Sequence, residues 1–447
     1  MRFSVKHLSH AAMSDFVGGY MNLKPIILVR FGYSSLSGGY RRLYEILKRG
    51  KSEGIDYIVI TDSKSCENAV KIFPDFMEIL GQYKVFKKDF KKNGFAFPIM
   101  KQVYSYKRIV DLALFISRVA KEEDADLIIN PGEGTFGVLT CYLASVFCSK
   151  PWTAIFQPTA YLLQPSYSLG PLNPLNVFKH MNKKASINTQ SLISKVGLSI
   201  DLLSLLKISE RTVILAVSNS VVEDFSFMNP RIRFITITPG NGIDVGKFPK
   251  ELTANFNYHG VFFARLVPEK GIFDLIEIWK PVVRKMPDAK LAICGIIEEK
   301  EIVEKFLKEV SESNLSHNVE FLGQQEEAKL LNIVANSYLT VYPSYVDSFS
   351  LVALESLGCG TPVVAYDIPA IRHNFSKSKA VFRVPIGDKE GMANMILHVL
   401  TKMERKSLSI EAKKFATLYD WDNVVKAEKE AYFKVIIEYS RSKKSLF

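Results

Sequence analysis

The chain has 447 residues, of which 47% are hydrophobic and 23% are charged. This balance excludes a disordered or collagen-like chain, and the length predicts two domains of about 200 residues each. The formal net charge of +12 favours an anionic substrate or an anionic membrane surface as a partner, although general solubility would explain the charge equally well. Nucleic acid is not an expected partner, because the usual nucleic-acid-binding motifs are absent from the sequence.

The N-terminal residues 1–23 are expected to form an extension before the first strand, without the apolar core and cleavage site of a signal peptide. No apolar run reaches the ~18 residues of a membrane-spanning helix, and the longest, Phe136–Phe147, is expected to form a buried helix. The 5 cysteines show no metal-ligand spacing, which favours a reducing compartment. We therefore expect a cytoplasmic protein, with peripheral attachment to the cytoplasmic membrane face left open.

Strand and helix patterns alternate through the first half of the chain. The apolar run Pro25–Phe31 predicts a strand buried on both faces, followed by a glycine-rich turn and a helix over residues 40–48. This rhythm predicts a parallel sheet with helices on both faces. Further strands of this half are expected at Tyr57–Thr61, Asp126–Asn130, Thr153–Gln157, Val213–Val217 and Arg233–Ile237.

A segment rich in Pro, Gly and Asn, Thr238–Asn257, predicts the linker. A second alternation then predicts another doubly wound domain over 246–418, facing the domain 1–245 across a cleft at the carboxyl ends of the strands. A long amphipathic helix, about Trp421–Tyr439, lies in the last segment, 419–447. The second series comprises strands at Val261–Arg265, Leu291–Cys294, Val319–Leu322, Leu339–Tyr342 and Pro362–Tyr366, and helices at Gly271–Arg284, Glu299–Glu312, Ala328–Ala335 and Leu351–Leu357.

The segment that follows the strand ending at Tyr342 carries the most informative polar residues. A loop contains Asp347 and Ser348, and the next helix begins near Leu351 and carries Glu355. Free N–H groups at a helix N-terminus bind anions or sugar hydroxyls, and the two carboxylates can accept hydrogen bonds from hydroxyl groups. The alternative is that Asp347 or Ser348 only caps the helix, which is common.

Two cations follow the first strand of the second domain. Arg265 ends that strand, and Lys270 with Gly271 is expected to open the next helix. Arginine offers a planar fork and lysine a point charge, so the two side chains are suited to a diphosphate. The alternative is a pair of solvated surface cations.

Together these blocks resemble the signature of the retaining glycosyltransferases of the GT-B fold, in the fourth family, which includes sucrose synthase and bacterial mannosyltransferases. That family shows a G-R-L-x-x-x-K-G block, an acidic-x7-acidic block followed by P-V-V-A, and an N-G-[VI]-D block, matched here by Ala264–Gly271, Asp347–Glu355 and Asn241–Asp244. The likeness is close in the C-terminal half and covers the N-terminal half in outline. It implies the α/β GT-B fold, two Rossmann-like domains with a C-terminal helix that crosses back onto the first.

The resemblance also implies roles for individual residues. Arg265 and Lys270 would bind the donor diphosphate and stabilise the charge on the leaving nucleotide. Glu355 would accept hydrogen bonds from the ribose, and Asp347, where the family usually has Glu, would contact the transferred sugar. The other donor contacts would be the N–H groups of Phe349, Ser350 and Leu351, and Gly295 and Gly323 would border the base.

The first domain offers candidates near its glycine-rich turn. In the family this turn approaches the donor phosphates and the acceptor, which suggests contacts at Gly38 and Gly39, although most such pairs are simple turns. Arg41 and Arg42 would meet an anionic acceptor or form solvated cations at a helix start. Gln157 stands where many family members have a histidine facing the sugar, and Glu133 would line the acceptor pocket or belong to a helix-start turn.

The resemblance implies transfer of a glycosyl group from a nucleotide sugar to an acceptor hydroxyl with retention of configuration, in glycan, glycolipid or surface polysaccharide synthesis. The acceptor would be a sugar or a lipid-linked or protein-linked glycan. We expect no cofactor and no metal, because family members use protein cations in place of Mg²⁺. A non-catalytic nucleotide-sugar or glycan-binding scaffold and a GT-B sugar epimerase remain alternatives, whereas a phosphorylase would need a pyridoxal-bearing lysine for which no context exists.

Overall fold

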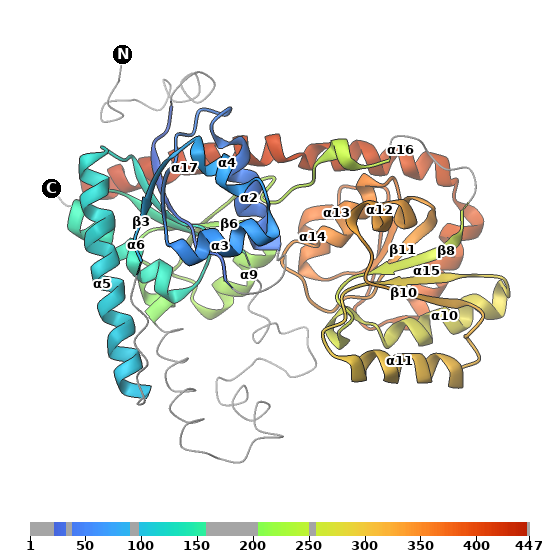
Figure 1. The fold of residues 1–447 in the computed structure, drawn as a ribbon. Coiled ribbons are helices and arrows are strands. Elements are labelled where there is room, and N and C mark those ends of the chain that lie inside the picture. Colours follow the sequence, from blue (N-terminus) through green and yellow to red (C-terminus); the bar gives the residue numbers. More distant parts are fainter. Residues whose placement is uncertain (1–21, 33–37, 90–97, 158–203, 250–255, 445–447) are drawn as a thin grey trace.

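The structure is a computed structural model, and it describes residues 22–32, 38–89, 98–157, 204–249 and 256–444. Two parallel sheets, each flanked by helices, lie next to each other along the molecule, and helices α16 (Arg405–Ala416) and α17 (Trp421–Lys444) run along one side of both (Figure 1). The predicted pair of Rossmann-like domains is confirmed.

The first domain contains a 7-stranded sheet in the order β3-β2-β1-β4-β5-β6-β7, and all its neighbours pair in parallel. Its central strands are fully buried because helices cover both faces, and the edge strands β3 and β7 are partly exposed. The strands are β1 (Pro25–Leu28), β2 (Ile58–Thr61), β3 (Lys84–Lys87), β4 (Leu127–Asn130), β5 (Trp152–Phe156), β6 (Val213–Ala216) and β7 (Arg233–Thr236). The described helices are α2 (Gly38–Gly50), α3 (Ser63–Ile72), α4 (Phe76–Gly81), α5 (Pro98–Glu122), α6 (Thr135–Cys148) and α9 (Asn219–Met228).

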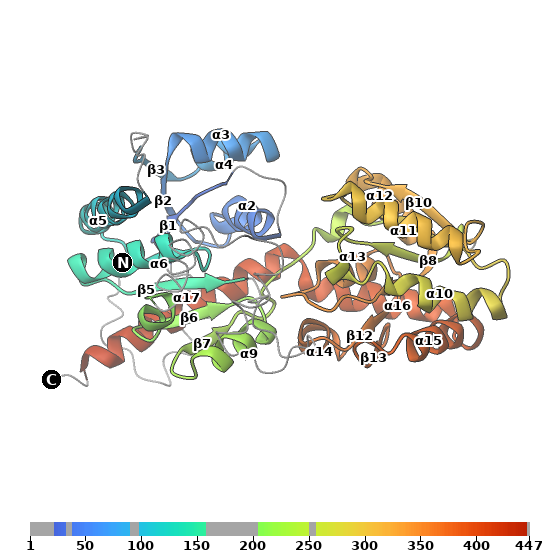
Figure 2. The same ribbon diagram turned by 90° about the horizontal axis from the view of Figure 1, so that it is seen from below.

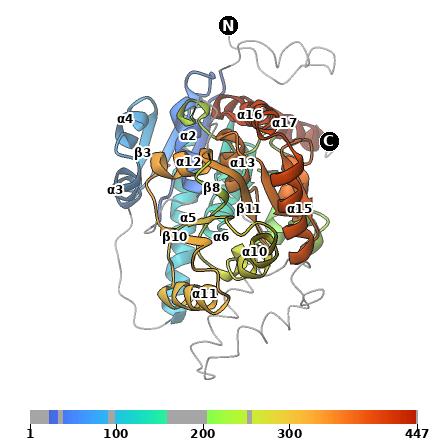
Figure 3. The ribbon, with the colours of Figure 1, turned by 90° about the vertical axis from the view of Figure 1, so that its right-hand side faces the viewer.

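The second domain contains a 6-stranded parallel sheet in the order β10-β9-β8-β11-β12-β13. Its strands are β8 (Tyr258–Phe263), β9 (Leu291–Cys294), β10 (Val319–Gly323), β11 (Ser337–Tyr342), β12 (Val363–Tyr366) and β13 (Val381–Val384). Its other helices are α10 (Asp274–Lys285), α11 (Lys300–Glu312), α12 (Glu327–Ala335), α13 (Leu351–Gly358), α14 (Pro369–Phe375) and α15 (Lys389–Lys402). Helix α10 packs against α15, and α13 packs against both α12 and α16; Figure 3 shows this domain end-on.

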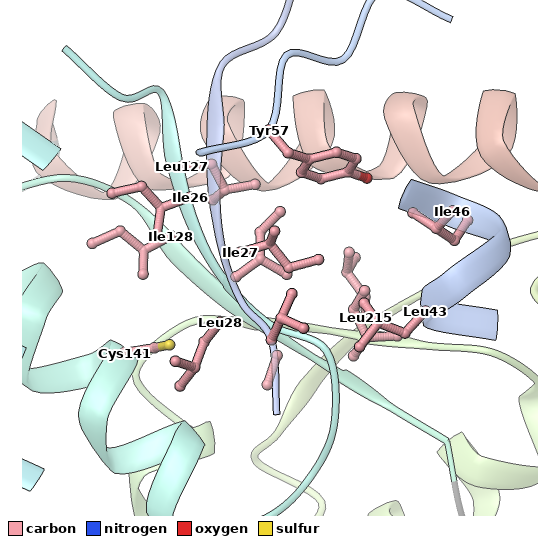
Figure 4. Packing of buried hydrophobic residues seen from close by; sticks show 14 of the residues in the cluster. Ile26, Ile27, Leu28, Leu43, Ile46, Tyr57, Leu127, Ile128, Cys141 and Leu215 are labelled. Atoms are coloured by element: carbon pink, nitrogen blue, oxygen red, sulfur yellow. The ribbon is translucent and has the colours of Figure 1, made fainter. Parts of the chain in front are cut away.

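Apolar residues of β1 form the centre of the first core. Ile26, Ile27 and Leu28 pack between residues of α2 and β4 and Cys141 of α6 (Figure 4). In both sheets the strand order reverses beside the first strand, between β1 and β4 and between β8 and β11. Loops diverge at such a point and leave a crevice at the carboxyl ends of the strands, which places a ligand site in each domain.

Two segments cross between the domains side by side. Ile243 N–H donates to the Tyr419 carbonyl at 2.9 Å, and Trp421 N–H donates to the Ile243 carbonyl at 3.2 Å. Beyond this bridge α17 crosses to the first domain (Figure 2). Its residues Trp421 and Tyr432 are buried in the first core. The prediction that the C-terminal helix returns to the first domain is therefore confirmed. The proposed boundary at residues 245 and 246 falls between β7 and β8.

Several predicted bounds are wrong. Strand β1 ends at Leu28, so Arg30 lies beyond it. Helix α10 begins at Asp274, because Gly271 has a φ of 76° and a Cβ there would lie 2.0 Å from the Pro343 carbonyl oxygen. Helix α6 is exposed at its last turn, where Val146 is 56% exposed, so it is buried on one face only. Residues 1–21 of the N-terminal extension and 33–37 of the glycine-rich turn lie outside the described residues.

Candidate active site

A cleft of about 2120 Å³ lies between the two domains. One wall comes from residues that follow β1, β4 and β5 and from the start of α2, and the other from residues that follow β8 and β9 and from the start of α13. The carboxyl ends of the strands in both sheets therefore open onto one cavity, as the sequence predicted.

Lys270 is the most enclosed cation on the second-domain wall, with only 11% of its side chain exposed. Its Nζ donates to Asp347 Oδ2 at 3.0 Å and to the Val346 carbonyl at 2.9 Å. Burial alone would lower the pKa of this ammonium, but the attraction of Asp347 and Tyr342 outweighs burial and raises it. A charged lysine that is largely shielded from solvent is suited to stabilising a phosphate oxygen, because water screens its charge only weakly. The alternative of a solvated surface cation is wrong for Lys270.

Asp347 is held in its ionised form by the same contacts. Burial would raise its pKa, but Lys270, the Tyr342 hydroxyl and the Ser348 N–H lower it below its ordinary value. Next to it, burial and Asp347 raise the pKa of Tyr342 to about 12. Both carboxylate oxygens of Asp347 thus accept hydrogen bonds from residues of the second domain, and Asp347 positions Lys270 at the cleft.

The stability that this ion pair contributes is expected to depend on pH at both ends of the range. The pKa of Asp347 is lowered in the folded state, so its contribution is present above about pH 4 and is lost as the pH falls through the folded value. The pKa of Lys270 is raised, so its contribution is complete below about pH 10 and is lost above. Urea unfolding of the wild type and Asp347→Asn should show a constant difference at neutral pH that shrinks on acidification. A difference that grows on acidification would contradict this assignment.

Arg265 differs from Lys270 in its environment. Its side chain is 51% exposed, and its Nη1 lies 3.0 Å from Glu298 Oε1 at the rim of the cleft. The alternative of a solvated cation describes Arg265 in this structure, although its position lets it reach into the cleft.

The N-terminus of α13 opens onto the cleft at Ser350. This residue is fully buried, has a φ of 73°, and its Oγ has no hydrogen-bond partner among the described residues. No side chain caps α13, so the alternative in which Asp347 or Ser348 caps it is wrong. Free helical N–H groups and an unsatisfied hydroxyl at a left-handed serine form a set of donors that an oxygen-rich ligand would satisfy. Phe349 and Leu351 line the cleft beside Ser350.

Glu355 contacts the first domain across the cleft. Arg41 Nη1 lies 3.6 Å from Glu355 Oε1, and its Nη2 lies 2.8 Å from Glu327 Oε1 on α12. Burial raises the pKa of Glu355, and Arg41 opposes that effect. Arg41 is therefore not a solvated cation, and its contact with an acceptor stays a prediction, since it also lines the cleft. It joins the two domains and partly neutralises the carboxylate that is assigned to the ribose.

Arg42, on the opposite side of α2, was also expected at the acceptor or in solvent, and both expectations are wrong. It is 1% exposed, its Nε donates to the Gly240 carbonyl at 2.7 Å, and its guanidinium pairs with the buried Glu428 of α17. Its role is structural, because it ties α2 to the linker and to the crossover helix.

The glycines at the start of α2 allow two close approaches. A Cβ on Gly38 would lie 3.2 Å from Leu351 Cδ1 of the second domain, and one on Gly39 would lie 3.2 Å from Gln157 Oε1. Gln157 follows β5, and its Nε2 donates to the Pro131 carbonyl at 2.7 Å. The start of α2 therefore contacts Leu351 on the opposite wall of the cleft and Gln157 on its own wall.

The remaining predicted residues also lie at or near the cleft. Glu133 lines the first-domain wall, and burial raises its pKa. Gly295 lines the second-domain wall, where a Cβ would lie 1.8 Å from the Ala264 carbonyl oxygen. Gly323 is displaced from the wall by one residue, since the lining begins at Gln324 and Gln325.

Other charged and polar residues of the cleft were not identified from the sequence. Arg30 could have been identified from the sequence, because it lies just beyond β1, but the predicted strand Pro25–Phe31 included it. Glu327 could not have been identified from the sequence, because its role depends on its ion pair with Arg41 of the other domain. The additional lining residues include Arg30, Asp62, Lys64, Arg108, Asn130, Gln324, Gln325 and Glu327.

The described residues contain no group of three or more His, Cys, Asp or Glu side chains placed to hold a metal ion. None of the helices within the described ranges combines the length and the apolar composition needed to cross a membrane. The expectation of a reaction without metal stays a prediction.

Two doubly wound domains that face a ligand cleft, joined by a returning C-terminal helix, define the GT-B class of glycosyltransferase folds. Residues 250–415, in the second domain, match the model of the family described as glycosyl transferases group 1. The resemblance that the sequence motifs predicted is confirmed for this domain.

Individual proteins resemble the chain over different lengths. The phosphatidyl-myo-inositol mannosyltransferase of Mycolicibacterium smegmatis is 29% identical over 195 residues, which are 42% of this chain and 49% of that enzyme. The chain therefore matches about half the length of this curated relative.

Solved structures match nearly the whole chain. Sucrose-phosphate synthase from Thermosynechococcus elongatus superposes on this chain with a TM-score of 0.66 at 16% identity. The superposition covers 93% of this chain and 100% of the synthase chain. Anabaena HepE in complex with UDP and glucose has a TM-score of 0.61 at 17% identity and covers 92% of this chain and 98% of its own. At these identities the structures establish the fold alone.

Proposed function

We propose that this protein transfers a glycosyl group from a nucleoside-diphosphate sugar to an acceptor hydroxyl, with retention of configuration. The observation that carries the proposal is the cluster at the second-domain wall, where Lys270, with 11% of its side chain exposed, lies near the uncapped start of α13 and the unsatisfied Ser350 hydroxyl. A cation and free donors in a cleft are suited to a diphosphate and the sugar attached to it. The family of the second domain supports the same function.

The residues divide the chemistry between binding and charge stabilisation. Lys270, with Arg265 at the rim, stabilises the negative charge that develops on the diphosphate as the glycosyl bond breaks. The α13 N-terminus holds sugar or phosphate oxygens, and Glu355 accepts hydrogen bonds from the ribose. The acceptor enters on the first-domain side, near Gln157 and Glu133, and its hydroxyl proton passes to the leaving phosphate on the same face of the sugar. Catalysis then depends mainly on positioning.

The donor and acceptor are proposed as classes. HepE is a fold relative in complex with UDP and glucose, which supports a uridine nucleotide and a hexose. The name of the mycobacterial relative specifies a phosphatidyl-myo-inositol acceptor, which supports a role in glycan or glycolipid synthesis and peripheral contact with a membrane. Helix α5 is amphipathic and would suit docking on an anionic membrane face, but it packs on the first core through Leu112, Ala113 and Ile116. That packing matches the simpler alternative of an ordinary sheet-covering helix.

A thermal-shift screen with UDP-, GDP- and ADP-sugars and their free diphosphates tests the donor site. A ligand at 100 times its Kd adds about 2.7 kcal/mol of stability. We expect one nucleotide family to stabilise the wild type, with the shift lost in Glu355→Ala and reduced in Arg265→Ala. Glu326→Ala removes an exposed carboxylate outside the cleft lining and should behave as the wild type.

Product analysis separates the proposed reaction from its rivals. Transfer predicts an acceptor-linked glycoside together with free nucleotide. A nucleotide that binds without any turnover would support the scaffold, and an altered sugar without glycoside formation would support the epimerase. If no nucleotide shifts the unfolding curve at millimolar concentration, the donor site is wrongly assigned.

A further inference from the structure

The first-domain wall of the cleft contains a pair of arginines that the proposed donor chemistry does not use. Arg30 follows β1, Arg108 lies on α5, and both line the cleft. Their guanidinium carbons lie 4.3 Å and 5.9 Å from the ring centroid of Phe136, in the first turn of α6. Three separate elements therefore place two cations beside one aromatic ring.

The two arginines are close enough to affect each other. Burial lowers the pKa of Arg30, Asp62 raises it, and Arg108 lowers it further, with a net lowering. Cation–π attraction to Phe136 offsets part of the cost of keeping like charges together. Such an arrangement is favourable when an anion binds between or beside the two groups, because planar guanidinium groups form paired hydrogen bonds to phosphate oxygens.

Two carboxylates on this wall, Asp62 and Asp89, accept hydrogen bonds from serine residues of the protein. Asp62 accepts hydrogen bonds from Ser65 N–H and Ser65 Oγ, at 2.8 Å and 3.0 Å, and so caps α3. Asp89 accepts from Ser63 N–H and Ser63 Oγ, both at 2.7 Å. Lys64 adds a further cation to the same wall. The third carboxyl group on this wall is Glu133, and burial raises its pKa, which favours its neutral form.

We propose that Arg30 and Arg108 form an anion subsite that binds a phosphate group carried by the acceptor. The acceptor would be a phosphorylated polyol or sugar, either as a soluble phosphate ester or as the headgroup of a lipid. This inference rests on the proposed function, since it assigns the first-domain side of the same cleft to the acceptor. The subsite uses residues beside β1, across the cleft from Lys270, so that the acceptor and donor phosphates bind different cations.

Binding measurements on the full chain test the subsite apart from the donor site. The protein is first saturated with the nucleoside diphosphate that stabilises it, which occupies Lys270, and glycerol 3-phosphate is then titrated by calorimetry. We expect glycerol 3-phosphate to bind where glycerol does not, and to bind at least about 10-fold more weakly to Arg30→Ala and to Arg108→Ala. Arg30→Lys, which keeps the charge, should retain part of the affinity and control for loss of packing on Phe136. Arg118→Ala, on the exposed part of α5, should bind as the wild type.

A second arm identifies the source of the phosphate. Vesicles of phosphatidylcholine with and without phosphatidylinositol are sedimented with the wild type and Arg30→Ala. Arginine-dependent binding to the phosphatidylinositol vesicles alone would assign the site to a lipid headgroup, and binding of glycerol 3-phosphate would assign it to a soluble ester. The proposal is overturned if neither probe shows a loss in the Arg30 and Arg108 variants, or if Arg118→Ala loses as much. Nucleotide binding in all variants reports on the donor site independently.

Discussion

Lys270→Ala is expected to lower kcat by about 10²–10³-fold while the folded protein still contains an intact cleft. The reason is that Lys270 is 11% exposed and held by Asp347 and the Val346 carbonyl, so its charge is fixed before the reaction begins. Removing a preorganised charge from a site of this kind typically costs about 2.7–4 kcal/mol of transition-state stabilisation. Initial rates of nucleotide release with a competent acceptor measure the effect. Arg265→Ala should have a smaller effect, because that side chain is half exposed.

A double variant separates catalysis from stability. Lys270→Ala alone leaves the partly buried Asp347 carboxylate without its main partner, which destabilises the fold as well. Lys270→Ala combined with Asp347→Asn removes both charges and should regain much of the stability without regaining activity. If the double variant recovers activity together with stability, Lys270 acts only through the fold, and its assignment to the diphosphate is wrong.

Arg42→Ala is expected to lower the free energy of unfolding of the first domain by about 3–5 kcal/mol. The guanidinium is 1% exposed and Glu428 is 0% exposed, so the substitution leaves a buried carboxylate unpaired and removes a donor from the Gly240 carbonyl. Because Glu428 lies on α17, the crossover helix should also detach more easily. Urea unfolding followed by tryptophan fluorescence reports on this change, since Trp421 is buried at the start of α17.

Two comparisons test the explanation. Arg233, on β7, lies 3.8 Å from Glu438 of α17, and the two side chains are 54% and 35% exposed, so Arg233→Ala should cost much less because solvent screens that contact. Replacing both buried partners, as Arg42→Met with Glu428→Leu, should restore most of the stability, because no unpaired charge remains. Equal losses in Arg42→Ala and Arg233→Ala would show that burial does not set the cost.

The second domain could be predicted well because its signals are local. Buried strands such as Leu291–Cys294 appear as short apolar runs, and the start of α13 near Leu351 follows from the polar loop before an apolar helix. The acidic pair Asp347 and Glu355 was found from its spacing and its resemblance to a family pattern. The predictions failed at Gly271, where the close contact with Pro343 delays the helix, because that contact joins distant parts of the chain.

The first domain was predicted less completely for the same physical reason. Its parallel strands are visible as apolar runs, but the roles of Arg41 and Arg42 depend on which element each side chain meets. Adjacent residues on a helix point in different directions. Arg41 therefore contacts the second domain, while Arg42 is buried against α17.

The sequence by itself determined the fold class, the order of the strands along the chain, and the residues that carry charge at the second-domain wall. Those features rest on apolar periodicity and on short motifs, which are properties of neighbouring residues. Only the tertiary structure decided that Lys270 is enclosed while Arg265 is at the rim, that Ser350 lacks a partner, and that Arg30 and Arg108 share Phe136. Burial, pairing and electrostatic environment depend on contacts between residues that are far apart in the chain, and the packing of two domains against each other sets those contacts.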